Sequence, residues 1–194
     1  MSILDLSRTN TDHAAPTPTD RLLTASLLLA PPIYLLADSL YASRGWDDPA
    51  AGGVHVIGAL LYGFVLLRLT SWARGRLAAG MLFAAVAGTA GNVAYGFNTI
   101  QVSLGGIDLV DASGPAVIIK PLGLFFPLAL FVGGVIALRV GQHRSGVLLM
   151  LSGAIWPIAH IGNIGWLAVA VNVLLVVAIM PLASARPTPD PTAA

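Results

Sequence analysis

The apolar stretch from Ser145 to Leu182, SGVLLMLSGAIWPIAHIGNIGWLAVAVNVLLVVAIMPL, determines how many times this chain can cross a membrane. About 20 apolar residues in a helix span the ~30 Å hydrocarbon core of a bilayer. The stretch is nearly twice that length, so we expect it to fold back once. The favoured break is His160–Gly165 (HIGNIG), where two glycines and an asparagine follow Pro157. One long tilted helix is the alternative.

Similar apolar runs occupy the rest of the chain, each bounded by charged residues, glycine or proline. They predict an all-α, polytopic transmembrane helical bundle with six spans, or five if the last stretch stays unbroken. The polar, Pro- and Thr-rich ends are expected to be disordered tails of residues 1–20 and 184–194. Within a transmembrane domain of residues 21–183, the expected spans are about 21–41, 53–70, 77–98, 116–140, 145–160 and 163–182.

The composition agrees with a chain surrounded by lipid. Of its 194 residues 56% are hydrophobic and 10% charged, against about 25% charged in soluble domains. A net charge of +1 provides no basic surface for nucleic acid. The absence of cysteine excludes disulfides and thiolate chemistry. Abundant Ala, Gly, Val, Pro and Arg, without Glu, are typical of a GC-rich bacterium, so we expect a multi-pass protein of its inner (plasma) membrane.

Basic residues near the span ends predict the orientation of the chain. Short loops rich in Lys and Arg stay in the cytoplasm. With six spans, both termini are therefore expected in the cytoplasm. The cytoplasmic side then carries Arg8, Arg21, Arg68, Arg74, Arg76, Arg139, Arg144 and Arg186, and the other side carries Arg44 and Lys120.

Polar side chains inside the spans are the best indication of function, because they are costly in a bilayer. Most of them fall in the outer halves of the spans. Residues three, four or seven apart share a helix face, as Tyr34, Asp38 and Tyr41 do. If such faces turn inward, they line a polar and aromatic pocket open to the outside. The expected binding residues are Tyr34, Asp38, His55, Asn92, Tyr95, Asn98, Lys120, Trp156, His160 and Asn163.

Each of these residues also has a purely structural explanation. Aromatic rings such as Tyr34 and Tyr95 can belong to an interfacial belt. The asparagines can cap helices or join them by hydrogen bonds. Lys120 can pair with Asp38 or with a loop carboxylate at Asp108 or Asp111.

His55 and His160 are the histidines expected within the spans. Imidazoles from two helices can ligate a haem iron, or a divalent metal together with Asp38. No His-x-x-x-His pair and no Glu accompanies them. We therefore expect no metal and no cofactor, with haem as the alternative.

Two further features concern packing and loops. Ala84, Gly88 and Gly91 form a small-residue stripe that permits close helix contact, either within one chain or in a homodimer. The outer segment 100–115 (IQVSLGGIDLVDASGP) is expected to be non-helical, serving as a cover over a pocket or as a plain connector.

These observations favour a small membrane protein that binds or passes a small molecule, lipid headgroup or ion at the outer pocket. A haem- or metal-dependent redox or lipid-modifying enzyme using His55 and His160 is one alternative. A non-catalytic accessory subunit of a membrane complex is another. The chain lacks a phosphate-binding loop, a nucleophile elbow and a charged relay through the membrane centre, which counts against primary active transport. A protein that is not an enzyme is favoured.

Overall fold

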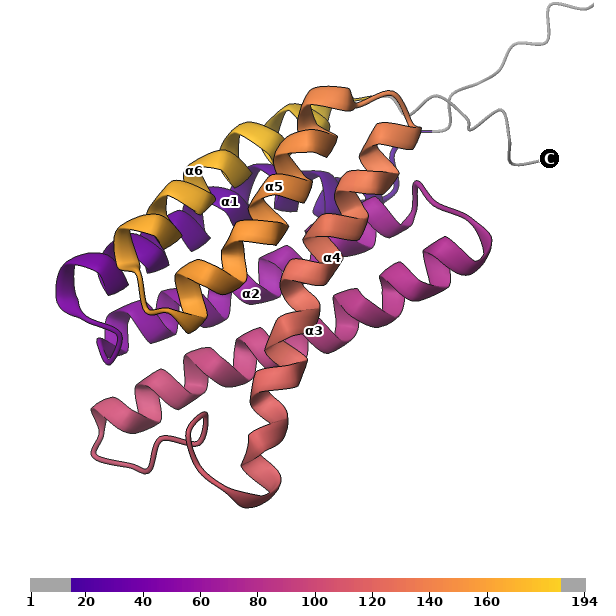
Figure 1. Cartoon of the computed structure of the whole chain (residues 1–194). Coiled ribbons are helices and arrows are strands. Elements are labelled where there is room, and N and C mark those ends of the chain that lie inside the picture. Colours follow the sequence, from indigo (N-terminus) through magenta and orange to yellow (C-terminus); the bar gives the residue numbers. More distant parts are fainter. Residues whose placement is uncertain (1–14, 186–194) are drawn as a thin grey trace, which may run out of the picture.

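The computed structural model describes residues 15–185, which fold into a bundle of helices (Figure 1). Six helical segments of the described chain are long and apolar enough to cross a membrane, if η1 is counted with α4 and η2 with α6, which confirms the predicted all-helical class. By helix length and hydropathy, this is a multi-pass membrane protein. The elements are α1 (Pro18–Arg44), α2 (Pro49–Thr70), α3 (Gly75–Ser103), η1 (Gly114–Ile118), α4 (Ile119–Arg139), α5 (His143–Ile161), α6 (Gly165–Ile179) and η2 (Met180–Ser184).

The last apolar stretch breaks at the predicted place, which excludes one long tilted helix. α5 ends at Ile161, and α6 begins at Gly165. Between them Asn163 has a φ of 51°, a left-handed conformation that Asn adopts more readily than most residues. Gly165 packs on α1 so closely that a Cβ there would lie 2.8 Å from the Cα of Ala42. Glycine thus permits α6 to start against the end of α1.

The first helix begins with a capping box. The Thr17 hydroxyl accepts a hydrogen bond from the Asp20 amide (3.1 Å), and the Thr17 amide donates to the Asp20 carboxylate (3.2 Å). Pro18 at the first helical position adds a preset φ angle. Pro18 to Asp20 therefore belong to α1, although they fall in the expected N-terminal tail. Ser184 likewise belongs to η2, although it falls in the expected C-terminal tail. The tail predictions for 1–14 and 186–194 lie outside the described residues.

α3 is longer than its predicted span. The sequence placed its end near Asn98, but the helix continues to Ser103, so the expectation of a non-helical segment was wrong for residues 100–103. The helix stops where two glycines follow: Gly105 has a φ of 80°, and the Gly106 amide donates to the Gln101 carbonyl (2.9 Å). A left-handed glycine after the last turn is a common helix stop.

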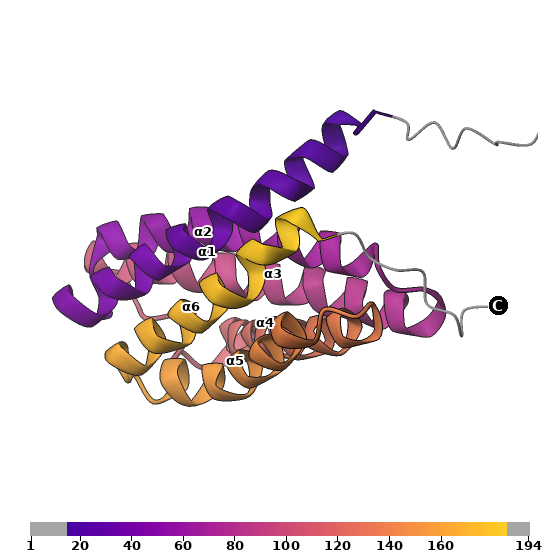
Figure 2. The same ribbon diagram turned by 90° about the horizontal axis from the view of Figure 1, so that it is seen from above.

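The six helices form a closed circle. Each packs against the next one along the chain, and α6 returns to pack against α1 (Figures 1 and 2). α2 and α4 also touch across the interior. This arrangement brings the inward faces of α1, α2, α3, α5 and α6 toward one another.

The small-residue stripe of α3 packs against α4 of the same chain. At Gly88 and Gly91, a Cβ would overlap with backbone atoms of α4 between Leu122 and Phe126. Only glycine allows two helix backbones to approach so closely. The stripe is therefore used within one chain.

Candidate functional site

The centre of the site is a fully buried carboxylate. Asp38 of α1 has an exposed fraction of 0%. Its Oδ2 accepts a hydrogen bond from the Asn172 amide of α6 (2.5 Å) and lies 3.1 Å from Nε2 of His160, the second-last residue of α5. Helices that are distant in the sequence thus meet at this one side chain.

The hydrogen bonds of His160 define where its protons lie. Nδ1 is 3.1 Å from the Trp156 carbonyl oxygen, which can only accept, so Nδ1 carries a proton. Nε2 faces Asp38 Oδ2, and one further proton lies between them. Whether that proton is bound to nitrogen or to oxygen, the Asp38–His160 pair has no net charge. This neutrality makes its burial tolerable, since an isolated charge would be far more costly.

A second polar cluster lies one helical turn away along α1. The Tyr34 hydroxyl donates to Asn92 Oδ1 (3.2 Å) and lies 3.2 Å from His55 Nε2. Because Tyr34 has only one hydroxyl proton, Nε2 of His55 acts as the donor in the second bond. All three side chains are buried. Tyr34 therefore links α1 to α2 and α3, as Asp38 links α1 to α5 and α6.

Aromatic rings surround both clusters. Trp156 stacks on His160 with ring centroids 3.9 Å apart, and Tyr34 lies 4.8 Å from His55. The contacts close on themselves, and Asp38 lies between two of the members, Tyr34 and Tyr41, along α1. The closed series runs from Trp156 through His160, Trp46, Tyr41, His55, Tyr34 and Phe126 back to Trp156.

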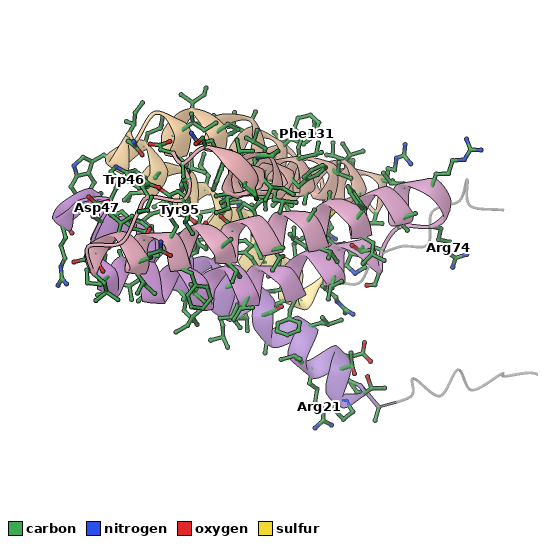
Figure 3. The ribbon with its side chains drawn as sticks, turned by 90° about the horizontal axis from the view of Figure 1, so that it is seen from below. Arg21, Trp46, Asp47, Arg74, Tyr95 and Phe131 are labelled. Carbon is green, nitrogen blue, oxygen red and sulfur yellow. The ribbon has the colours of Figure 1, made fainter. Side chains whose placement is uncertain are left out.

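Trp46 covers the end of the site that lies at the α1–α2 turn. It lies in the turn between α1 and α2, stacks on Tyr41 with centroids 5.1 Å apart, and donates from Nε1 to the Asn163 carbonyl (3.2 Å). It thereby joins the α1–α2 turn to the α5–α6 turn. Figure 3 shows Trp46, Asp47 and Tyr95 at one end of the molecule. We name Trp46 the cap of the site.

Removing the cap is expected to expose residues beneath it. Thr99 is buried and accepts a hydrogen bond from Tyr41 (3.3 Å), which lies under Trp46. Trp46→Ala removes the stacking contact with Tyr41, the edge contact with His160 and one hydrogen bond, together at least about 2 kcal/mol. The labelling rate of a Thr99→Cys variant by a cationic methanethiosulfonate should then rise at least about tenfold.

The control for this labelling experiment uses a buried residue far from Trp46. Ser26 is equally buried near the other end of α1. A Ser26→Cys variant should label at the same rate with and without Trp46. An equal rise at both positions would indicate general loosening of the bundle, and the cap would then have no specific role.

Several buried polar atoms of the site have no hydrogen-bond partner among the described residues. Orphaned buried groups are rare in proteins and cost about 1–3 kcal/mol each. Most of the atoms of this kind in the part of the chain that the structure describes belong to the buried helix faces around Asp38 and Tyr34, and the others are Arg68 Nε and Thr89 Oγ1. The orphaned atoms of the site are Asp38 Oδ1, His55 Nδ1, Tyr62 Oη, Asn92 Nδ2, Ser152 Oγ, Trp156 Nε1 and Asn172 Oδ1.

The structure brings most of the residues predicted for binding together. Tyr95 is half-buried, with its ring centroid 5.6 Å from that of His55. Inward-facing helix faces were the basis of the prediction, and here they point inward. The buried members of the set are Tyr34, Asp38, His55, Asn92, Asn98, Trp156 and His160.

Three predicted residues lie away from the buried carboxylate. Lys120 is exposed and pairs with Asp111 (2.6 Å). Of the partners expected for Lys120, the structure therefore shows a loop carboxylate and not Asp38. Asn98 binds the α3–α4 loop, donating to Asp108 (2.9 Å). The exposed Asn163 contributes its backbone carbonyl. These residues organise the loops at the end of the bundle.

Asn172 and Trp46 are members of the site that sequence reasoning missed. Asn172 is a single polar residue in the apolar run VAVNVLLVV, and such isolation in a span is a usable signal. Trp46 lies in a turn beside Gly45, and nothing in its local sequence distinguishes it from an interfacial tryptophan.

The geometry does not favour the haem or metal alternative. His160 already uses both ring nitrogens, so ligation would have to break the bond to Asp38 or to the Trp156 carbonyl. His55 has only Nδ1 free. Within residues 15–185, no group of three or more His, Cys, Asp or Glu side chains is arranged to hold a metal ion.

A separate groove of about 430 Å³ lies between α2 and α3. Its walls are almost entirely apolar, so it suits hydrocarbon better than a polar ligand. The lining residues are Leu60, Gly63, Phe64, Leu67, Ala85, Val86, Thr89, Ala90 and Val93.

Comparison with protein-family models, with curated proteins and with solved structures finds no match to this chain.

Proposed function

We propose that this chain binds or passes a small molecule at the cluster around Asp38, in the extracytoplasmic half of the bundle. The observation that carries the proposal is a carboxylate with no exposed surface whose Oδ1 has no donor among the described residues. A carboxylate in a membrane span is costly, and such residues commonly mark a site for a substrate or an ion. A residue that served packing alone would gain nothing from an oxygen left without a partner.

The orientation follows from the distribution of charge. Arg21 and Arg74 lie at the end opposite Trp46 and Asp47 (Figure 3). Under the positive-inside rule, the arginine-rich end faces the cytoplasm. Asp38 then lies about 9 Å along α1 from the outer end of that helix. At this depth a small molecule from outside can reach the carboxylate past Trp46.

Cysteine labelling tests this orientation in a chain that has no native cysteine. Asp47 and Arg74 are both exposed. In intact cells, a membrane-impermeant maleimide should label Asp47→Cys, and it should label Arg74→Cys only after permeabilisation. The reverse pattern would place the site on the cytoplasmic side and contradict the proposed entry from outside.

Native mass spectrometry tests the binding function without knowledge of the ligand. Purified wild-type protein should release a small molecule or lipid in a fixed ratio of ligand to protein. The near-isosteric Asp38→Asn variant should retain about tenfold less of it, because one charged hydrogen bond to the ligand is lost. The control is Asp111→Asn, which changes an exposed carboxylate in the α3–α4 loop and should retain the wild-type amount.

The same measurement separates binding from a purely structural role. If folded wild-type and Asp38→Asn proteins retain the same compounds in the same amounts, Asp38 does not bind the ligand. An accessory subunit, whose polar residues only join helices, would then become the better explanation.

A further inference from the structure

We propose that the ligand is a small organic amine in its protonated form, and that its binding expels the proton shared by Asp38 and His160. This inference rests on the proposed function, because it names the ligand class and the ion exchange at the same site. Three features carry it: the orphaned oxygens, the aromatic series and the hydrogen bonds of His160.

The orphaned oxygens call for a donor. Asp38 Oδ1 and Asn172 Oδ1 both lack a partner among the described residues, and their two side chains are hydrogen-bonded to each other. An alkylammonium group has only donors and pairs well with a carboxylate. A hard metal ion would instead require about six oxygen ligands. The two orphaned oxygens therefore suit an ammonium group better than a metal ion.

The aromatic series favours the same kind of ligand. Ring faces attract cations and repel anions, because their π electrons carry partial negative charge. The His160 ring lies between Trp156 (3.9 Å) and Trp46 (6.0 Å), and Tyr41 lies beside Trp46. A cation that reaches Asp38 from the capped end passes these rings. An anion would meet both the rings and the carboxylate with repulsion.

Charge balance requires the exchange. Before binding, one carboxylate and the shared proton give a net charge of zero at the Asp38–His160 pair. If the ammonium entered while that proton remained, two positive charges would share one buried carboxylate, an arrangement that a low-dielectric site opposes. When the proton leaves, the ammonium replaces it, and the net charge is again zero.

The steps balance in atoms and charge. The proton between His160 Nε2 and Asp38 Oδ2 leaves to the outer water, and the ammonium takes its place at the carboxylate. His160 remains neutral with its proton on Nδ1, held by the Trp156 carbonyl. No other bond forms or breaks. Each amine bound from outside therefore releases about one proton to the outside.

The other titratable groups around Asp38 define the competing explanation. His55 is the second imidazole near the carboxylate, and its Nδ1 is free to take a proton, so it is the alternative source or acceptor in the exchange. Replacing each histidine in turn tests which of the two, His55 or His160, takes part in the proton exchange. The groups concerned are Tyr34 and Tyr41 on α1, His55 and Tyr62 on α2, Tyr95 on α3 and His160 on α5, with Asp47 and Asp48 in the turn beside Trp46.

Isothermal titration calorimetry in buffers of different ionisation enthalpy tests the proposal on the whole chain in detergent near neutral pH. The probes are n-butylammonium and 2-phenylethylammonium, with 2-phenylethanol and sodium chloride as controls. We expect saturable binding of the ammonium probes alone, with about one proton released per molecule bound. The Asp38→Asn variant should lose this binding, and Asp111→Asn should keep it.

The histidine variants assign the proton. His160→Gln should still release about one proton when the amine binds, because a buried Asp38 without its histidine holds the proton itself. His55→Gln should also release about one proton, and loss of the release in this variant would make His55 its source. Amine binding by the wild-type chain without proton release would overturn the exchange and leave the proposed function standing. Binding of the alcohol or of sodium in place of the amines would overturn the ligand class. Failure of both amines to bind would overturn the inference, and the proposed function would still be judged by its own mass-spectrometry test.

Discussion

Replacing Gly91 with alanine is expected to lower the free energy of unfolding by about 3 kcal/mol. The added methyl group would overlap with the backbone at Leu122 and Gly123, and a helix backbone cannot move aside as the end of a flexible side chain can. α3 and α4 would have to separate, and contacts along both helices would be lost. Unfolding in detergent, followed by circular dichroism during a titration with sodium dodecyl sulfate, measures the change.

Gly123 supplies a matched control from the other side of the same contact. A Cβ on Gly123 would meet no heavy atom within 4 Å. Gly123→Ala should therefore leave the helices in place and raise helix stability by up to about 1 kcal/mol. Both variants add one methyl group at the same contact, which meets the partner helix at Gly91 and open space at Gly123. Equal effects of both would show that helix propensity, and not the close approach of α3 and α4, determines stability at this contact.

Much of this fold can be predicted from the sequence because lipid imposes a simple requirement. Each span needs about 20 apolar residues, and the runs in this chain are interrupted by charges, glycines or prolines. The break between α5 and α6 follows from the local weakness at Gly162 and Asn163. The true end of α3 was missed, since Ile100 to Ser103 suit a helix as well as a loop, and the following glycines determine where the helix ends.

The site was predicted where the evidence lies within a single helix. Tyr34 and Asp38 are four residues apart, so their common face could be read directly from the sequence. The pairing of residues on different helices could not be read from the sequence. Asn172 is 134 residues from Asp38, and only the return of α6 to α1 brings them together.

Loop residues were the least predictable part. Lys120 was assigned to the pocket because it begins an apolar run, yet a carboxylate at Asp111, nine residues earlier, lies closer to water and holds it there. A long flexible amine reaches the exposed partner at lower desolvation cost than the buried Asp38. Trp46 shows the converse, since its role as the cap depends on the carbonyl of Asn163 in a distant turn.

Removing either partner of the Asp38–His160 pair is expected to destabilise the protein by about 3–5 kcal/mol, because the other partner is left buried without its counterpart. Asp38→Ala also removes the acceptor of the Asn172 amide. Removing both partners leaves no uncompensated charge. The double variant Asp38→Ala/His160→Ala should therefore lose less than the sum of the two single losses, by up to about 3 kcal/mol.

An exposed pair in the same chain provides the comparison. Lys120 and Asp111 lie closer together (2.6 Å) than Asp38 and His160 (3.1 Å), yet both of their side chains are exposed. Their coupling in the same kind of cycle should stay below about 1 kcal/mol. Because the shorter pair is expected to couple more weakly, the comparison separates burial from distance as the source of the energy. If the losses at Asp38 and His160 simply add, the two groups share no proton in the folded protein, and the exchange of that proton for an amine has no physical basis.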